Sequence, residues 1–262
     1  APIMAPPKTY RCEAIILSYT PLGEADLLVT MFTRDQGKVR AVGKGARRST
    51  SRLVGHLEPL TAVKMSMAHG RSMDIITQAE VIEGFSKLKE NLTAIAKGQY
   101  LAEIVDGFGA EASPNPSLYQ LMIDTLQAVE ADPASDMPLR FFEFHLLQVS
   151  GLMPELYHCV ECRVELEPNA HRFSPNVGGT LCLDCHPDDA HLRPLSLRAL
   201  KVLRLLERSE IAESCKLSLD DSLAAELKSL LSTTVSYWLG KEIRSNSFLE
   251  RLNSETLPEV YI

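Results

Sequence analysis

The sequence predicts an α+β protein in which a small β-barrel is followed by a helical domain with an inserted four-cysteine segment. Three observations in the 262-residue chain predict this fold. Apolar residues alternate with a period near two from Arg11 to about Ile82. After Gly84 they recur with helical spacing instead. Two Cys-x-x-Cys pairs then interrupt the helical part.

The composition restricts the class of protein. With 45% hydrophobic residues the chain can bury a sizeable core, and its length suggests one or two domains. Residues 1–10 contain prolines but no apolar run, so they are expected to be a disordered leader and not a signal peptide or anchor. No stretch approaches the roughly 20 apolar residues that span a bilayer. Free-thiol, metal-binding cysteine usage favours a reducing cytoplasm.

The net charge of −7 hides an asymmetry along the chain. Residues 1–84 contain eleven Lys and Arg against eight Asp and Glu, whereas the remainder contains sixteen against twenty-six. An acidic protein with one basic end has the charge distribution expected when one domain binds a polyanion.

Residues 11–84 are expected to form the barrel. Five short runs rich in β-branched and aromatic residues are separated by turn signals such as Pro21-Leu-Gly23 and Asp35-Gln-Gly37. Closure of either the OB or the SH3 type would remove the exposed sheet edges, and periodicity does not choose between them. The expected strands are Cys12–Tyr19, Ala25–Thr33, Lys38–Val42, Leu60–Met67 and Met73–Ile82.

Residues 85–153 and 194–254 are expected to form a single helical domain. A Ser113-Pro-Asn-Pro116 break separates its first two apolar stripes. Asp136 followed by Pro138 predicts a helix start, and Gly151 and Gly240 predict helix ends. Residues 255–262 show no clear period and are expected to fray.

Residues 154–193 contain the two cysteine pairs, Cys159 with Cys162 and Cys182 with Cys185. Four thiolates at this spacing suit one structural Zn²⁺, because four protein ligands leave no position for water or substrate. An iron centre, two disulfides or four core thiols are the alternatives. Nearby histidines are expected at the surface or around the ligands: His158, His171, His186 and His191.

A basic stretch overlaps the third predicted strand. Alternation places Lys38 and Arg40 on one strand face, and Gly43 and Gly45 are expected to release a mobile basic loop. Guanidinium and ammonium groups there suit phosphate oxygens, although a merely solvated charged loop is the alternative. The candidate nucleic-acid-binding residues are Lys38, Arg40, Lys44, Arg47, Arg48 and Arg52.

No enzyme is predicted. The stretch from Gly37 to Lys44 has five residues where a Walker A loop requires four, and Arg48 stands where a dinucleotide fingerprint requires its third glycine. The chain also lacks the Gly-x-Ser-x-Gly and His-Glu-x-x-His motifs. Few aromatic residues occur in the barrel region, so binding without sequence preference is expected.

Six segments of the chain form a distinctive series: Glu13-Ala-Ile-Ile-Leu17, Gly23-Glu-Ala-Asp-Leu-Leu-Val-Thr30, Gly37-Lys-Val-Arg-Ala-Val-Gly-Lys-Gly-Ala-Arg-Arg48, Leu57-Glu-Pro-Leu60, Ser86 to Asp106, and Arg140-Phe-Phe-Glu-Phe-His-Leu-Leu147. Together with the two cysteine pairs, they resemble the bacterial RecO family of recombination mediators. The resemblance covers nearly the whole chain. Its most specific parts are Gly23-Glu-Ala-Asp26 and the basic stretch ending in Arg48.

The resemblance implies an OB-fold followed by a helical domain with a structural zinc. It implies binding of single- and double-stranded DNA, strand annealing, partnership with RecR, and help in loading RecA. It also implies contact with the C-terminal tail of single-stranded DNA-binding protein (SSB), for which Arg140 is the candidate residue. These functions belong to the cytoplasm, in association with the nucleoid. The alternative hypothesis is a zinc-ribbon adaptor that binds an acidic protein and not DNA.

Overall fold

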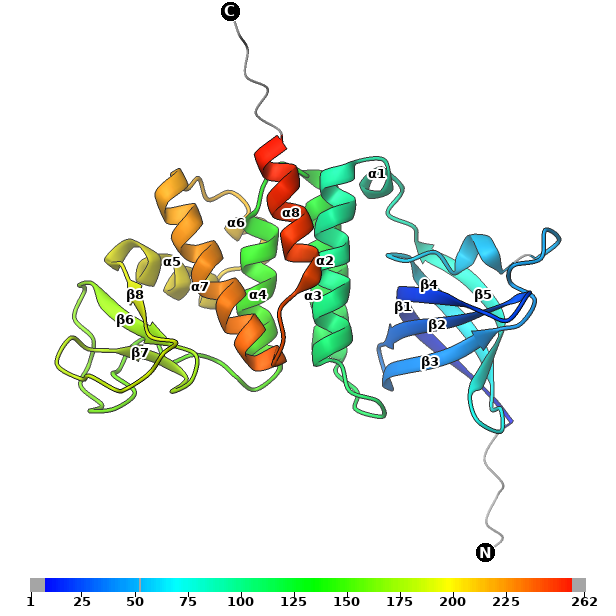
Figure 1. Cartoon of the computed structure of the whole chain (residues 1–262), viewed down its shortest axis with the longest axis horizontal. Helices are drawn as coiled ribbons and strands as arrows, with labels where there is room; N and C mark the ends of the chain where they lie inside the picture. Colours follow the sequence, from blue (N-terminus) through cyan, green and yellow to red (C-terminus); the bar gives the residue numbers. More distant parts are fainter. Residues whose placement is uncertain (1–7, 52, 256–262) are drawn as a thin grey trace, which may run out of the picture. The chain divides into compact units, whose positions relative to one another are not determined.

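The first five strands close into a barrel, as Figure 1 shows. The computed structural model describes residues 8–51 and 53–255. The strand order is β1-β2-β3-β5-β4, and β4 returns to pair with β1. The β3–β5 pairing is parallel and the others are antiparallel. The elements are β1 (Thr9–Leu22), β2 (Asp26–Thr33), β3 (Gly37–Gly43), the 3-10 helix η1 (Val54–His56), β4 (Ala62–Ala68) and β5 (Asp74–Glu83).

This Greek-key barrel is an OB-fold, so the predicted α+β class is confirmed and the OB type of closure is the observed one. The period-two alternation fills the barrel interior, because every second side chain of a strand points inward. Ala14, Val29, Met31 and Ala41 are all fully shielded from solvent. A bulge between Ile16 and Ser18 shifts the register of β1 against β2.

Packing divides the chain into two compact units, one reaching to Leu126 and resuming at Ser245, the other covering Gln127–Arg244. The first unit therefore joins α2 and α8 to the barrel. The sequence instead places a boundary between residues 84 and 85, and its domain limits remain a prediction. The expected leader and tail fall largely outside the described residues.

The helices of the first unit begin at recognisable signals. Asn91 caps α2, because its side chain accepts a hydrogen bond from the backbone N–H of Ala94 at 3.0 Å. The predicted Pro-rich break separates α2 from α3. Ser245, at the start of α8, donates from its backbone N–H and hydroxyl to Glu103 of α2. The helices are α1 (Ser86–Lys89), α2 (Leu92–Phe108), α3 (Pro116–Ala131) and α8 (Arg244–Glu255).

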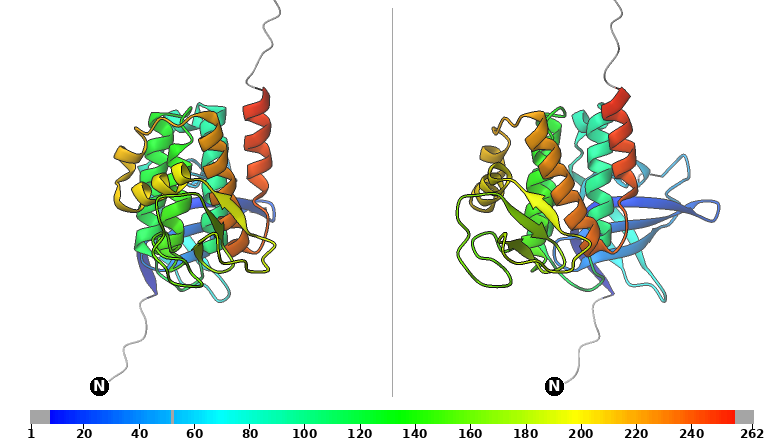
Figure 2. Two further views of the ribbon diagram at one scale, coloured as in Figure 1. Left: turned by 90° about the vertical axis from the view of Figure 1, so that its left-hand side faces the viewer. Right: turned by 60° about the vertical axis from the view of Figure 1, so that its left-hand side comes forward.

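The second unit combines helices with a small sheet (Figure 2), and the strand order of that sheet is β7-β6-β8. Helix α4 starts directly after Asp136, and α7 ends at Gly240 in the left-handed conformation, both as predicted. Helix α4 packs against α5, α6 and α7. The elements are α4 (Met137–Val149), β6 (His171–Ser174), β7 (Gly179–Leu181), β8 (Arg193–Leu195), α5 (Leu197–Arg208), α6 (Ile211–Ser214) and α7 (Asp221–Leu239).

The barrel joins α2 where β3 begins. The Lys38 side chain donates from Nζ to the backbone oxygen of Asp106 at 2.7 Å, and its backbone N–H donates to Ala110 at 3.0 Å. Gly109 lies against the ring of Phe32, where an added Cβ would come within 2.8 Å. One end of β3 is therefore held by the last turn of α2 and the loop that follows it.

In the part of the chain that the structure describes, no helix combines the length and apolarity required to cross a bilayer.

Replacing Gly37 with Ala should destabilise the first unit. Gly37 has φ of +72°, and an added Cβ would lie 2.3 Å from the backbone oxygen of Ser113. The left-handed conformation and the backbone overlap together should cost about 2–4 kcal/mol of unfolding free energy, measured by urea titration. Gly55→Ala is the control, because no atom lies within 4 Å of its added Cβ. Equal stability of the two variants would contradict the described joint.

Candidate metal centre and nucleic-acid interface

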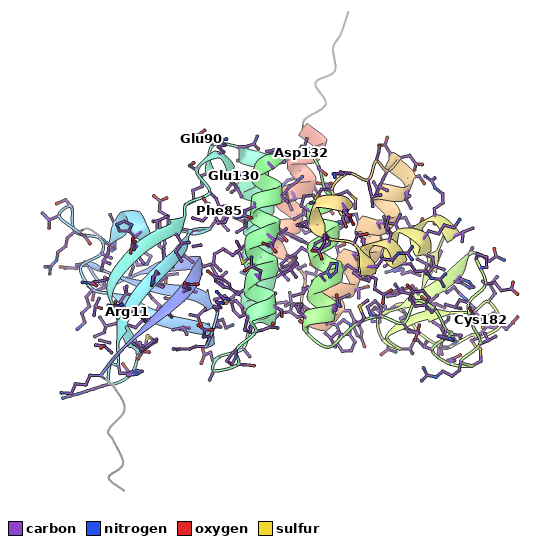
Figure 3. All side chains as sticks on the ribbon, turned by 180° about the vertical axis from the view of Figure 1, so that it is seen from behind. Arg11, Phe85, Glu90, Glu130, Asp132 and Cys182 are labelled. Carbon is purple, nitrogen blue, oxygen red and sulfur yellow. The ribbon has the colours of Figure 1, made fainter. Side chains whose placement is uncertain are left out.

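The four predicted cysteine ligands lie together in the second unit; Figure 3 labels Cys182 among them. Their sulfur atoms all lie within 4.8 Å of one another. The Cys159 and Cys185 sulfurs are 3.7 Å apart, as are those of Cys162 and Cys182. Cys159 and Cys182 are buried, whereas Cys162 is exposed. The cluster is therefore open to solvent on one side only.

The sulfur positions fit one tetrahedral ion. Bonds of about 2.3 Å to a central ion place tetrahedral sulfurs roughly 3.8 Å apart, close to the two separations of 3.7 Å given above. Disulfide sulfurs would lie about 2.05 Å apart, so these thiols are not bridged. All six cysteines of the chain lie within the described residues and are free. The group could hold a metal ion, and four protein ligands would give it a structural role.

Local hydrogen bonds shift the pKa values of the thiols in this cluster in opposite directions. Burial opposes ionisation of Cys159, but backbone N–H groups of Cys182, Cys162 and Glu161 approach its sulfur and lower its pKa to about 6. A hydrogen bond with Cys182 raises the pKa of Cys185 above its ordinary value. One sulfur is thus favoured as the thiolate while a neighbour retains its proton. A cation bound by all four would displace the remaining protons.

Arg172 of β6 braces the turn of the second cysteine pair. Its Nη2 donates to the backbone oxygens of Cys182, Leu183 and Cys185 at 3.1, 2.8 and 2.5 Å. Its Nη1 donates to Nδ1 of His186 at 2.9 Å. The guanidinium therefore closes the ligand turn independently of any ion. Arg172 was not predicted as part of the site, because its position in the chain, between the two cysteine pairs, carries no motif.

None of the four neighbouring histidines joins the thiol cluster among the described residues. His171 is buried, with Nε2 2.8 Å from the backbone oxygen of Glu167. His191 packs against the ring of Tyr237. The remaining two are exposed: His158 and His186.

The basic stretch lies on β3 and the loop that follows it. As the alternation predicts, Ala41 points into the core while Arg40 is exposed on the outer face. Lys38 is largely covered, because its ammonium group also lies 3.3 Å from the carboxylate of Asp106. Three further candidates are exposed: Lys44, Arg47 and Arg48. Arg52 lies outside the described residues.

Backbone hydrogen bonds connect the loop after β3 to the β1–β2 turn, and the expected mobility of this loop stays a prediction. The backbone N–H of Gly45 donates to the Asp26 carboxylate at 2.7 Å, and that of Arg47 donates to Ala25 at 2.9 Å. Ala46 is fully buried in the barrel core between these contacts. The loop thereby holds Arg47 against the β1–β2 turn. A buried alanine inside a basic run was the signal that sequence analysis overlooked.

A groove of about 660 Å³ adjoins the outer face of β3. It runs between the β2–β3 turn, the β4–β5 turn and the α2–α3 loop, all within the first unit. In OB-folds, the β4–β5 loop and the strand 2–3 face are parts of the usual oligonucleotide surface. The groove adds Arg71, an exposed cation that the sequence analysis did not single out because it stands alone in its turn. Its charged lining residues are Asp35, Lys38, Arg40, Arg71, Asp74 and Glu111.

Comparison with known proteins identifies the family. The family model for the recombination protein O N terminal region matches residues 4–85, and that for its C terminal region matches residues 89–247. A curated protein from Roseiflexus sp. (strain RS-1), named DNA repair protein RecO, is 39% identical over 243 residues, covering 93% of this chain and 86% of its own.

The chain belongs to the RecO family. Two further relatives have the same printed name. The one from Desulforudis audaxviator is 35% identical over 245 residues, covering 94% of this chain and 98% of its own. The one from Desulforamulus reducens is 34% identical over 250 residues, covering 95% and 97%.

In this RecO-family chain Arg140 is an interior residue of α4 and not a surface cation. It is 4% exposed, and its Nη2 donates to Oε1 of Glu143 at 2.9 Å. The role of Arg140 in partner binding stays a prediction.

Replacing Arg172 with Gln in this RecO-family protein should weaken metal retention. Groups that support metal ligands typically change affinity by about 10–100-fold when lost, and chelator competition would measure that shift. Arg193→Gln on the neighbouring exposed strand position is the matched control. Affinity unchanged by Arg172→Gln would mean that the ligand turn closes without its guanidinium.

Proposed function

We propose that this protein binds single- and double-stranded DNA through phosphate contacts, anneals complementary strands and acts as a non-enzymatic mediator of recombinational repair. The observation that carries the proposal is the cluster of exposed cations on the outer face of an OB-fold barrel. Membership of the RecO family and the printed name of the relatives, DNA repair protein RecO, support the same conclusion. Phosphate contacts bind without reading sequence, and no bond is made or broken.

The proposed contacts follow β3 and its two ends. Lys38 and Lys44 are six residues apart, which is about 20 Å along a strand and comparable to several phosphate spacings. The exposed cations on β3, in the loop after it and in the β4–β5 turn are Arg40, Lys44, Arg47, Arg48 and Arg71. Lys38 contributes chiefly by holding β3 to α2, and Arg52 completes the proposed set. The anchored loop presents its arginines without a large ordering cost.

Neutralisation of phosphates explains how such a surface could promote annealing. Two strands repel each other through their phosphates, so a cationic surface that engages both lowers the cost of bringing them together. The acidic remainder of the chain would not compete for DNA. Binding of this kind weakens as the salt concentration rises, because salt cations compete with the protein for the phosphates.

We further propose that the four thiols hold one Zn²⁺. Soft thiolate ligands in a tetrahedral arrangement favour zinc, which would shape residues 154–193 without catalysing a reaction. The partners proposed from family membership are RecR, the C-terminal tail of SSB, and RecA as the protein whose loading is assisted. The proposed compartment is the cytoplasm, in association with the nucleoid.

Binding of a labelled oligothymidine across a salt series tests the DNA proposal. Five exposed cations at about 0.7 per single-strand contact predict a slope of log K against log salt near −3.5. An adaptor that uses these cations for an acidic protein would show no saturable binding of the oligonucleotide.

Replacing Arg47 and Arg48 together with Ala should reduce the slope to about −2.1 and weaken binding by about 25-fold at 0.1 M salt. The loss should be similar for unrelated sequences, because phosphates are common to all of them. The control removes two exposed cations of the second unit, Lys201→Ala with Lys216→Ala, and should leave the slope unchanged. Equal losses in both double variants would mean that net charge, and not this loop, drives binding.

Replacing Cys162 and Cys185 together with Ser should abolish metal retention and loosen the segment that follows. Tyr237 donates its hydroxyl to Asn176 at 2.7 Å, beside the chain's single tryptophan, Trp238. Metal content should fall to background and the tryptophan emission should shift to the red. Cys215→Ser, outside the cluster, should change neither. Normal metal content in the double variant would exclude the four-thiol site.

A further inference from the structure

The β4–β5 turn that carries Arg71 is unusually tight. It covers His69–Met73 and borders the groove beside β3. A Cβ added to Gly70 would lie 1.9 Å from the backbone oxygen of Met73, so the turn folds back closely on itself. Arg71 follows Gly70 and is exposed, and no ion pair joins it to another described residue. Its charge is therefore available to an anion in the groove.

Three polar side chains hold the base of this turn. Tyr10 of β1 donates its hydroxyl to Oδ2 of Asp74 at 2.6 Å. Nδ1 of His69 lies 3.1 Å from the other carboxylate oxygen, and the rings of Tyr10 and His69 are 4.9 Å apart. The Asp74 carboxylate thus connects the first residue of β5 to the end of β4 and to β1. We call Tyr10, Asp74 and His69 the turn brace.

The protonation states of the turn brace agree with its geometry. Burial and the hydrogen bond to Asp74 raise the pKa of Tyr10, so it stays a neutral donor. Burial opposes ionisation of Asp74, but hydrogen bonds from Tyr10 and His69 outweigh it and lower the pKa of the carboxyl. Asp74 is therefore a carboxylate at neutral pH, and it lines a groove that also contains cations.

The turn brace also lies at the strand pairing of the barrel that has the fewest paired positions. Strands β3 and β5 pair at only two positions among the described residues, Ala41 with Asp74 and Val42 with Ile75. Arg40 precedes the first of these on β3, and Arg71 precedes Asp74 in the turn. The distance between the two guanidinium groups therefore depends on how firmly Asp74 is held against β3.

We propose that the turn brace positions Arg71 beside Arg40, so that the two guanidinium groups bind neighbouring phosphates of single-stranded nucleic acid in the groove. This inference rests on the proposed DNA-binding function and names residues that control it. Tyr10, Asp74 and His69 are positioning residues. Asp74 contributes through the geometry of the turn, although its own charge repels the phosphates.

Asp74→Asn separates these two effects by the sign of the change. If Asp74 acted only through its charge, removing that charge would strengthen binding of an oligothymidine of about 16 nucleotides, the upper site size of an OB-fold. If it positions Arg71, the variant should instead lose one phosphate contact, which is about fivefold at 0.1 M salt. Asp35→Asn, in the same groove and outside the turn brace, is the matched control and should strengthen binding.

Tyr10→Phe provides a second variant without a charge change. It keeps the ring against His69 and removes the hydroxyl that bonds Asp74, so it should weaken binding and reduce the salt slope by about 0.7. Thermal unfolding would verify that the variant is folded.

A double-variant cycle then tests whether Tyr10 and Asp74 affect DNA binding through Arg71. In an Arg71→Ala background, Tyr10→Phe and Asp74→Asn should have little further effect on affinity, because the contact that they position is already absent. Additive losses, or tighter binding by Asp74→Asn, would overturn the inference. If the unaltered protein bound the oligonucleotide with no salt dependence, the proposed function itself would fail, which is a different outcome from a failed cycle.

Discussion

The two-point pairing of β3 with β5 is the constraint on which the candidate nucleic-acid surface depends. It closes the barrel, and most of the groove's lining belongs to these two strands and the turns beside them, with Tyr10 of β1 and the α2–α3 loop providing the rest. At one end Lys38 joins β3 to α2, and at the other Ala46 inserts the basic loop into the core. A short seam is thus supported on both sides. Buried contacts on both sides of this pairing therefore hold the backbone that carries the exposed cations.

The metal segment solves a different problem with few apolar residues. Leu166 and Leu181 are buried around two of the ligand cysteines, so the apolar core of this segment is small. Four thiols and the guanidinium of Arg172 add connections between its turns. A segment with so little apolar surface gains order from coordination and hydrogen bonding, as small metal-binding modules generally do.

The regular elements were predictable because each has a strong periodic signal. All five barrel strands, the break before Pro116, the end of α7 at Gly240 and the grouping of four cysteines follow from spacing in the sequence. Strands β6 to β8 are three or four residues long, which is too short to show a clear alternation of apolar and polar residues. Helix α8 was not separated because its packing partner, Glu103, is more than a hundred residues away.

The candidate site was predictable only in part, for a related reason. Clusters of cations are visible in a sequence, but their availability depends on distant residues. Asp106 covers Lys38, Glu143 pairs with Arg140 inside the protein, and Tyr10 reaches Asp74 across 64 positions. Arg71 has no charged neighbour in its turn and becomes notable only because the barrel places it in the same groove as Arg40.

The return of the chain to its first unit at Ser245 also sets an order of events during synthesis. Helix α8 contacts α2 through Glu103, yet the whole of Gln127–Arg244 is translated between them. Chains emerge at roughly 5–20 residues per second, so the barrel-bearing unit waits several seconds for its last helix. The inserted unit is translated during that interval, so its chain is complete before α8 can join the first unit. The part of the polypeptide that leaves the ribosome first therefore lacks one of its packing partners until the end of synthesis.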